Sequence, residues 1–229
     1  MLCGAIDIGS NTTRLLVAEP SEGQLRKVME QRAYTRIGKD ASKDGKITAE
    51  KVAEVAEVVT TQVRLAHEMG AEVVKTVATA AIRESKNRDK VVKEIEEVAQ
   101  VEVDVLDEEE EGRFAFIGAT KSLGHPVEGN VAVGGSATSL RTLVGAVLEY
   151  ETLERAVRVL SSDEIYEVAK RFELDSRRVK LLPAGVLLLE KFSQMLGQPL
   201  QIGRGGLREG IILTLLNGKE NGSHQKLAA

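Results

Sequence analysis

The sequence is poor in the residues that build disulfide or metal-cluster proteins. Its 229 residues include one cysteine, Cys3, which excludes an intramolecular disulfide and a cysteine-cluster metal site. The position of Cys3 in the first predicted strand favours an inert buried thiol. His67, His125 and His224 lie far apart without the spacing of metal ligands, so we assign them no role.

Long apolar runs and an excess of basic charge are also absent. No run approaches the roughly 20 apolar residues that span a bilayer, and no basic segment precedes an apolar one at the N-terminus. The net charge of -4, with both signs interspersed, gives no general attraction to nucleic acid. We therefore expect a soluble, cytoplasmic protein that binds neither membrane nor nucleic acid. A polyanionic substrate would have to be attracted by local Arg and Lys side chains.

The apolar content of 42% is enough for a normal core in one large or two small domains. The most informative stretch is residues 5–17, which read Ala-Ile-Asp-Ile-Gly-Ser-Asn-Thr-Thr-Arg-Leu-Leu-Val and predict two strands joined by a tight turn. A buried carboxylate is costly unless it is compensated, so Asp7 is expected to face a cleft, a metal or a bound water. Gly9 and the polar residues 10–13 suit a phosphate-binding turn. An ordinary hairpin with Asp7 in an Asx-turn is the alternative.

Residues 1–123 predict the order β-β-β-α-β-α-β-α. Leu25 to Tyr34 is typical of a third strand. Thr48 is a plausible N-cap for a helix that ends at Gly70, and Asn87 can cap the following helix. The β-branched run 73–78 predicts a strand covered on both faces. This order indicates an α/β layer with a mixed sheet.

Two features of this half point to chemistry. The acidic run 107–111 begins a helix, where carboxylates are favoured by the dipole and are commonly just solvated. Arg83 follows the strand 73–78, and its guanidinium suits a phosphate; its alternative role is to neutralise Glu84 or Asp89 on the surface.

The second half carries a glycine turn and few strands. Gly134 to Ser139 follow the strand 131–133, with Leu140, Leu143 and Val147 on one face of the next helix. Such a turn suits phosphate, although Gly-Gly also makes plain turns. Only 130–133 and 200–202 are obvious strands, under three or four helices. Two strands leave unpaired edges, so we expect either a dimer or a distorted second lobe.

These segments resemble the exopolyphosphatase / guanosine pentaphosphate phosphatase (Ppx/GppA) family of the actin-like ATPase superfamily. The Asp-Ile-Gly-Ser-Asn-Thr hairpin resembles the family's first phosphate loop, and the run ending in Glu111 is similar to its Glu-Glu-Ala-Arg segment, with Gly112 in place of Ala. Arg83 matches the Arg of its Ala-Thr-x-Ala-x-Arg segment, and residues 201–213 resemble its terminal Leu-Arg-Glu-Gly element.

The glycine turn resembles the family's later Val-Gly-Gly-Thr-Ala-Thr turn. The family's Asp-Ile-Gly-Gly-Gly-Ser-Thr-Glu hairpin has no counterpart, so about 40 residues or more are expected to be missing between Asn130 and Gly134. The resemblance implies an actin-like (ribonuclease H-like) α/β fold. It implies a complete first half-domain at 1–123, a reduced second half-domain at 124–217 and a disordered tail at 218–229.

The resemblance further implies a phosphoanhydride hydrolase that releases terminal phosphate from inorganic polyphosphate or guanosine pentaphosphate. Glu111 would activate water, and Asp7 would hold Mg²⁺ with its bound water, the two residues lining opposite sides of one crevice. A homodimer is expected, with activity impaired by the missing segment. The implied phosphate-binding residues are Gly9, Ser10, Asn11, Thr12, Arg83, Gly134, Gly135, Ser136 and Thr138.

Two other functions stay open. The missing segment favours a non-catalytic module that binds polyphosphate or nucleotide. An actin-like small-molecule kinase shares the Asp-Ile-Gly start, but it needs a catalytic Asp in the second half, for which the sequence offers no candidate.

Overall fold

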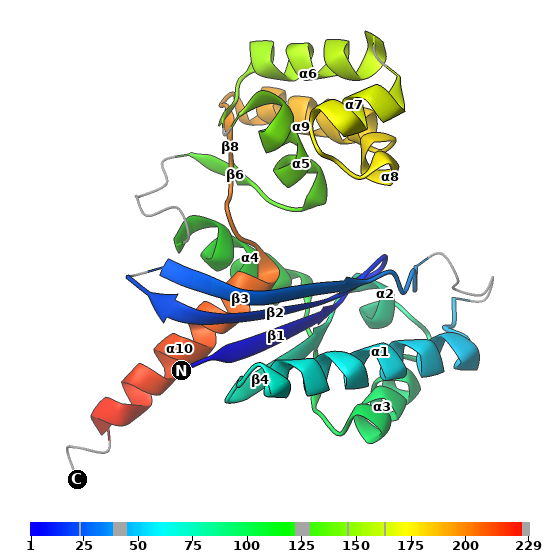
Figure 1. The fold of residues 1–229 in the computed structure, drawn as a ribbon, viewed down its shortest axis with the longest axis vertical. Coiled ribbons are helices and arrows are strands. Elements are labelled where there is room, and N and C mark those ends of the chain that lie inside the picture. The colour runs from blue at the N-terminus through cyan, green and yellow to red at the C-terminus, as the bar shows by residue number, and fades with distance from the viewer. Residues whose placement is uncertain (23, 39–44, 122–128, 146, 163, 226–229) are drawn as a thin grey trace. The chain divides into compact units, whose positions relative to one another are not determined.

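The computed structural model describes residues 1–22, 24–38, 45–121, 129–145, 147–162 and 164–225 (Figure 1). The chain divides into two compact units, which are described separately below. The first consists of Met1–Ile117 together with the segment that begins at Leu207, and the second is Gly118–Gly206.

The first unit is built on a five-stranded mixed sheet in the order β3-β2-β1-β4-β5. Strand β1 pairs antiparallel with β2 and parallel with β4. The predicted order of strands and helices is confirmed, with a single-turn helix, α2, added after β4. The elements are β1 (Cys3–Ile8), β2 (Thr13–Ser21), β3 (Gln24–Ala33), α1 (Ala49–Glu68), β4 (Val73–Ala78), α2 (Ala80–Arg83), α3 (Arg88–Ala99), β5 (Val103–Val105), α4 (Glu108–Lys121) and α10 (Leu207–Gln225).

Two predicted helix starts have different outcomes. Thr48 caps α1 as expected, because its side chain accepts a hydrogen bond from the Lys51 backbone N–H at 3.3 Å. Asn87 precedes α3 but makes no cap bond there. Its side chain instead bonds both the N–H and the C=O of Ile47, at 3.0 and 2.9 Å, and so ties the segment before α1 to the start of α3.

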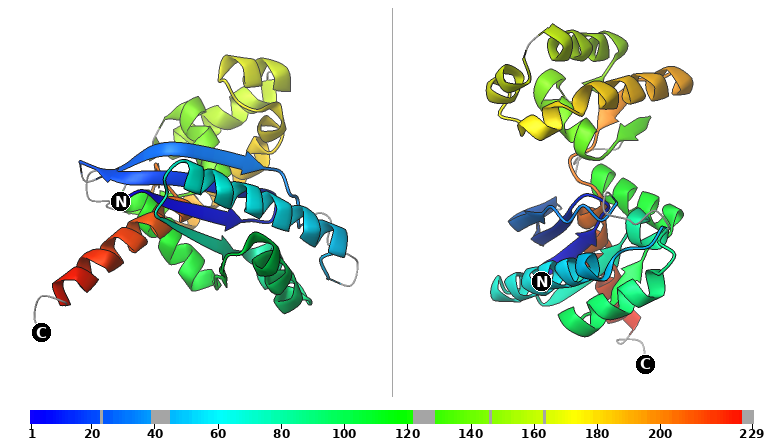
Figure 2. Two further views of the ribbon diagram at one scale, coloured as in Figure 1. Left: turned by 60° about the horizontal axis from the view of Figure 1, so that its bottom comes forward. Right: turned by 90° about the vertical axis from the view of Figure 1, so that its right-hand side faces the viewer.

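Alternation along β1 separates the two faces of this sheet. Ile6 and Ile8 pack into the core made with α1 and α3, whereas Cys3 and Ala5 pack into the core made with α10. In Figure 2 the helices α1 and α3 lie against one face of the sheet and α10 against the other. Asp7 has the parity of Cys3 and Ala5, so it belongs to the α10 face.

The terminal helix corrects the predicted domain boundaries. Ile211 and Ile212 of α10 are buried against residues of β1 and β2, so the segment from Leu207 belongs to the first unit and not to the half-domain 124–217. The division falls after Ile117, and the predicted boundary at 123/124 lies outside the described residues. Helix α10 continues to Gln225, through most of the segment expected to be disordered, and residues 226–229 lie outside the described residues. The sequence shows the apolar stripe of α10 but not the sheet face that buries it.

The second unit has a small three-stranded sheet in the order β6-β8-β7, with β6 parallel to β8. Two strands were predicted. Val147 forms part of β7 instead of the preceding helix, because α5 ends at Gly145, whose φ of 100° is left-handed. The elements are β6 (Asn130–Ala132), α5 (Gly135–Val144), β7 (Val147–Leu148), α6 (Tyr150–Ser162), α7 (Ile165–Arg171), α8 (Ser176–Val179), α9 (Leu182–Leu196) and β8 (Leu200–Ile202).

The core of this unit joins the sheet to α5, α6 and α9 through Leu140, Leu148, Leu153 and Val186. None of the helices in the described part of the chain is long and apolar enough to cross a membrane.

The position of α10 can be tested with a core substitution. Ile212 is fully buried, so Ile212→Ala should lower the free energy of unfolding by about 2–5 kcal/mol. Urea denaturation followed by circular dichroism measures this change. Asn217→Ala, at an exposed position of the same helix, is the control and should change stability by less than about 0.5 kcal/mol. A surface-like effect of Ile212→Ala would contradict the packing described here.

Candidate functional site

The turn between β1 and β2 leaves little room for a side chain at its first position, Gly9. The Gly9 N–H donates to the Thr12 carbonyl at 3.1 Å. A Cβ on Gly9 would lie 3.1 Å from the Thr12 carbonyl oxygen and 3.8 Å from Asp7 Oδ1. A side chain at this position would therefore crowd the turn on the side that faces the carboxylate.

A second segment holds the tip of this turn through backbone bonds. The Ser10 carbonyl accepts from the Gly38 N–H at 2.8 Å, and the Asn11 carbonyl accepts from the Arg36 N–H at 3.1 Å. The side chains of Ser10 and Asn11 remain exposed. The turn is thus fixed by its carbonyls, while its polar side chains stay available to a ligand.

Asp7 is a partly buried charge of this region, and its Oδ1 atom is buried. Its Oδ1 atom has no hydrogen-bond partner among the described residues. Burial raises the pKa of Asp7 to about 6, against the opposing effect of the positive charges of Arg208 and Arg14, and the negative charge of Glu111 adds to the rise. A raised pKa at a buried group without a bonded partner is typical of a functional carboxylate.

Helix α4 carries the second carboxylate. Its start is fixed by a reciprocal cap: the Glu110 N–H donates to Asp107 Oδ1 at 2.8 Å, and the Asp107 N–H donates to Glu110 Oε2 at 3.3 Å. Glu111 follows this cap and is 35% exposed. A Cβ at Gly112 would meet nothing within 4 Å, so the helix has room for the Ala expected there from the family pattern.

Arg83 pairs with the acidic start of α4. Its Nη1 donates to Glu111 Oε2 and to the Leu106 carbonyl, both at 2.9 Å, and its Nε lies 3.1 Å from Glu108 Oε1. The hydrogen bond with Glu111 raises the pKa of Arg83. The alternative partners of Arg83 were Glu84 and Asp89. The charge of Glu84 does contribute to the raised pKa of Arg83, but the close ion pairs of Arg83 are with Glu108 and Glu111. The contacts seen here orient Glu111, and phosphate binding by Arg83 stays a prediction.

Asp7 and Glu111 are within electrostatic reach of one another, because the charge of Glu111 contributes to the raised pKa of Asp7. The alternation along β1 explains why the charge of Glu111 reaches Asp7. Leu106 and Phe114 lie before and after Glu111 in the sequence, and they pack on the side of the sheet that Asp7 faces. The structure thus pairs Arg83 with Glu111, and the charge of Glu111 acts on Asp7.

Arg208 is a residue of this site to which the sequence analysis assigns no role. Its Nη1 donates to the Leu15 carbonyl at 3.1 Å, and its Nη2 donates to Glu30 Oε1 at 2.6 Å. It is 7% exposed, and its charge acts on Asp7. The sequence feature that could have indicated Arg208 is the terminal Leu-Arg-Glu-Gly match. Without the fold, however, a residue so far along the chain could not be placed beside Asp7 on β1.

The glycine turn 134–138 belongs to the second unit and forms the start of α5. Gly134 has a φ of 99°, and the Thr138 hydroxyl donates to its carbonyl at 2.9 Å. Ser136 packs against Gly185, where an added Cβ would lie 2.8 Å from the serine side chain. Gly134 and Gly135 are exposed. Phosphate binding by Gly134, Gly135, Ser136 and Thr138 stays a prediction.

A metal site here would rest on Asp7 rather than on a cluster. No group of three or more His, Cys, Asp or Glu side chains in the described ranges is arranged to hold a metal ion. Mg²⁺ in phosphate chemistry is commonly bound by one or two carboxylates together with phosphate oxygens and waters. The buried, unpartnered Oδ1 of Asp7 fits that pattern.

The five-stranded sheet with its β1–β2 turn, a buried Asp at the end of β1 and helices on both faces is an actin-like ATPase fold, and solved structures of the same fold support this class. The crystal structure of the Aquifex aeolicus Ppx/GppA family member matches with a TM-score of 0.82 at 22% identity, covering 96% of this chain and 98% of that one. An exopolyphosphatase from Cytophaga hutchinsonii matches with a TM-score of 0.76 at 14% identity, covering 95% and 98%.

The family follows from the sequence itself. The model of the Ppx/GppA phosphatase family matches residues 16–145, and the chain belongs to this family. Exopolyphosphatase 1 of Mycobacterium tuberculosis is 27% identical over 125 residues, or 54% of this chain and 36% of that protein. Exopolyphosphatase 1 of Mycobacterium leprae is 27% identical over 143 residues, or 61% of this chain and 42% of that protein. The chain thus matches less than half the length of these two relatives.

The raised pKa of Asp7 predicts a specific pH dependence of stability. The carboxyl of Asp7 binds its proton more tightly in the folded chain than in the unfolded chain. The stability that this protonation contributes is therefore present below pH 3.8 and is lost as the pH rises to about 6. Asp7→Asn should therefore raise the free energy of unfolding at neutral pH by about 2–3 kcal/mol. The difference from wild type should vanish below pH 3.8.

Urea titrations of wild type and Asp7→Asn, at neutral pH and below pH 3.8, measure this difference. Because the two proteins are compared at the same pH, the contributions of the other titrating groups cancel. A variant less stable than wild type at neutral pH would contradict the account of Asp7 as a charge whose burial is only partly offset by Arg208 and Arg14.

The role of Arg208 can be measured on Asp7 directly. Arg208→Met removes a positive charge that lowers the pKa of Asp7, so this pKa should rise further above about 6. Loss of the bonds to the Leu15 carbonyl and Glu30 should also cost about 1–3 kcal/mol of stability. Carboxyl NMR titration reports the pKa, and Arg204→Met, at an exposed position, is the control. An unchanged pKa of Asp7 would remove Arg208 from the site.

Proposed function

We propose that this chain is a phosphoanhydride hydrolase that releases terminal phosphate from a polyphosphate-type substrate. The observation that carries the proposal is the pair of carboxylates on one face of the first sheet. Asp7 is partly buried, and its buried Oδ1 atom has no described partner. Glu111 is bonded to Arg83, and its charge acts on Asp7. Membership of a phosphatase family and likeness to proteins named exopolyphosphatase support the same activity.

Glu111 is the general base in this proposal. It is partly exposed, so water can reach it, and its Oε2 is held by Arg83 at 2.9 Å. Attack of a water oxygen on the terminal phosphorus breaks the phosphoanhydride P–O bond, the water proton passes to Glu111, and the shortened polyphosphate leaves. The family match favours this hydrolysis over the kinase reaction considered from the sequence.

The β1–β2 turn binds the phosphate oxygens in this proposal. The exposed side chains of Ser10 and Asn11, with the Thr12 hydroxyl, offer polar groups around a turn whose backbone is already fixed. Preorganised groups of this kind stabilise charge in the transition state without reorganising. Arg83 has room for a second role, because a guanidinium carries five N–H donors.

Mg²⁺ is the metal that this donor set fits. Asp7 would hold it through Oδ1, and the ion would neutralise charge on the phosphate oxygens. The substrate proposed is inorganic polyphosphate, with guanosine pentaphosphate as the second candidate, because both present a terminal phosphoanhydride.

Binding without turnover is a second candidate function. It is favoured by one observation: the glycine turn at 134 is preceded by Val131, Ala132 and Val133, so no carboxylate precedes it in its strand. A site with one phosphate turn and one carboxylate strand can bind an anion even where hydrolysis is slow.

Phosphate release with matched variants tests the proposal. The full chain is incubated with Mg²⁺ and with one of three substrates, long-chain polyphosphate, guanosine pentaphosphate or ATP. The phosphate that is released is then measured. Glu111→Gln keeps the shape of the side chain but removes the base, so release should fall by about 10²–10⁴-fold. Glu109→Gln, an exposed position in the first turn of the same helix, is the control and should retain activity.

Equal release by wild type and Glu111→Gln would overturn the proposed mechanism. No release by wild type, with polyphosphate binding detected by calorimetry, would instead establish the binding function.

A further inference from the structure

Two arginines stand directly opposite each other on the face of the first sheet that carries Asp7. The strand register places Asp7 opposite Arg14 and Arg14 opposite Arg32, so the three residues form one row across β1, β2 and β3. Arg14 has the parity of Leu16, which packs in the core made with α10. The row therefore lies on the α10 side of the sheet, and we call it the Asp7–Arg32 row.

The arginine pair of this row is unfavourable without a ligand. Like charges directly opposite each other on paired strands destabilise a sheet. Elsewhere on the same two strands the charges are complementary, since Arg26 is opposite Glu19 and forms an ion pair with it. Glu30, two residues before Arg32 on the same face, is bonded to Arg208 at 2.6 Å. An anion bound between the two guanidinium groups of the row would replace their repulsion by attraction.

Arg14 connects the row to the candidate site. Its Nε donates to the Thr12 hydroxyl of the β1–β2 turn at 3.0 Å. Burial raises the pKa of Asp7, and the charges of Arg208 and Arg14 oppose this rise. Arg32 is exposed on β3, the edge strand of the sheet. Because neighbouring strands are about 4.7–4.9 Å apart, the row extends roughly 10 Å from Asp7 to Arg32.

We propose that Arg14 and Arg32 bind the phosphate groups that follow the terminal phosphate of a polyphosphate chain. This inference rests on the proposed function, because it starts from a terminal phosphate held beside Asp7 and the β1–β2 turn. A guanidinium binds phosphate with two parallel hydrogen bonds, and successive phosphates carry the repeated negative charge that two adjacent arginines neutralise. Arg32 is the specificity-determining residue, because a short phosphate chain ends before it reaches the edge strand.

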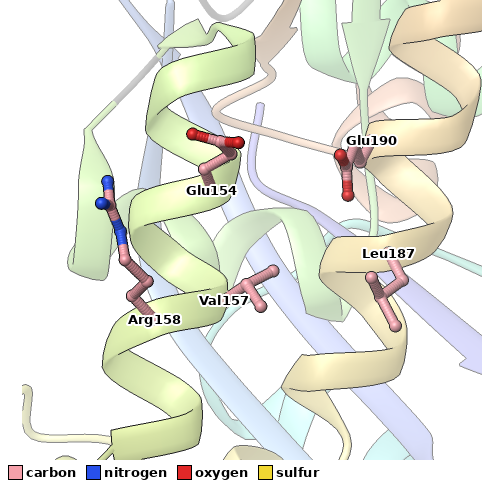
Figure 3. Close-up of a pocket in the computed structure, with 5 residues that line it drawn as sticks. All are labelled: Glu154, Val157, Arg158, Leu187 and Glu190. Carbon is pink, nitrogen blue, oxygen red and sulfur yellow. The ribbon is translucent and has the colours of Figure 1, made fainter.

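A pocket in the second unit does not suit the same ligand. It lies between α6 and α9 and is lined by Glu154, Val157, Arg158, Leu187 and Glu190. Figure 3 shows Glu154 and Glu190 pointing toward the space between the two helices, with Arg158 on the side of α6 away from Glu190. Two carboxylates repel a polyanion, so this pocket is not an alternative site for the phosphate chain.

Calorimetric binding of phosphate chains of two lengths tests the role of Arg32. The full chain carries Glu111→Gln in every sample, so that polyphosphate is not consumed while it is titrated in the presence of Mg²⁺. Adding Arg32→Gln should raise the dissociation constant for long-chain polyphosphate by about tenfold, the effect of losing one charge-assisted contact. The dissociation constant for pyrophosphate should stay unchanged, because pyrophosphate has a single phosphate beyond the terminal one.

Arg26→Gln is the matched control. It removes the same charge from the same strand, at a side chain that is 61% exposed and has its own carboxylate partner. It should leave both dissociation constants unchanged. Arg32→Gln should also lower the slope of log dissociation constant against log salt concentration by about one, since one fewer phosphate is neutralised, whereas Arg26→Gln should not.

A charge reversal separates a ligand contact from a structural one. Arg32→Glu places an opposite charge across from Arg14, so the urea midpoint of unfolding should rise at low ionic strength. The dissociation constant for long-chain polyphosphate should rise by about 100-fold, because the charge at this position changes by two. A residue with only a structural role would instead lose stability and binding together.

Equal dissociation constants for Arg32→Gln and Arg26→Gln would overturn the inference. An effect of Arg32→Gln that is as large for pyrophosphate, or that appears with guanosine pentaphosphate alone, would also contradict it. Failure of the proposed function gives a different result: a wild-type chain whose polyphosphate binding depends on Arg32, but which releases no phosphate, would support the inference and contradict the hydrolysis. A chain that binds no polyphosphate would contradict both.

Discussion

The site of this protein depends on a carboxylate buried at the end of a central strand. Asp7 lies on β1, which pairs with β2 on one side and with β4 on the other. Its Oδ1 atom has no described hydrogen-bond partner, and its pKa is raised to about 6. Such a group destabilises the fold at neutral pH, and sequences tolerate that cost where the charge is used. The surrounding features either compensate the charge or keep it accessible: Arg14 opposite on β2, Arg208 from α10, and a turn in which a side chain at Gly9 would be crowded.

Helix α10 completes this arrangement from the end of the chain. Arg208 joins the Leu15 carbonyl to Glu30, and the neighbouring Glu209 pairs with Lys27 at 3.1 Å, so alternating charges tie α10 to β2 and β3. Arg208 and Glu209 are buried, and for such groups the hydrogen bonds decide whether burial is tolerated. The same helix buries Ile211 and Ile212 against the sheet, so packing and electrostatics at Asp7 are coupled through one element.

Local signals predicted the first unit well and the second less well. Alternation, β-branched runs and the Thr48 cap are properties of a few neighbouring residues, and β1 to α4 form where these signals place them. In the second unit, Gly145 divides a run that looked helical and leaves Val147 and Leu148 to pair with β8, which is a contact with residues far along the chain. Asn87 likewise looked like a cap, but its side chain satisfies Ile47 instead.

The sequence by itself determined which residue types stand at the site: Asp7 in a strand before a glycine turn, and Glu111 in an acidic helix start. Both are recognisable because a charge within an apolar run and a carboxylate at a helix N-terminus are local patterns. Only the tertiary structure decided their partners, namely that Arg83 holds Glu111 and that Arg208 acts on Asp7. Burial, pKa and ion pairing depend on segments brought together by the sheet, and no local pattern specifies which distant arginine fills the space beside a buried carboxylate.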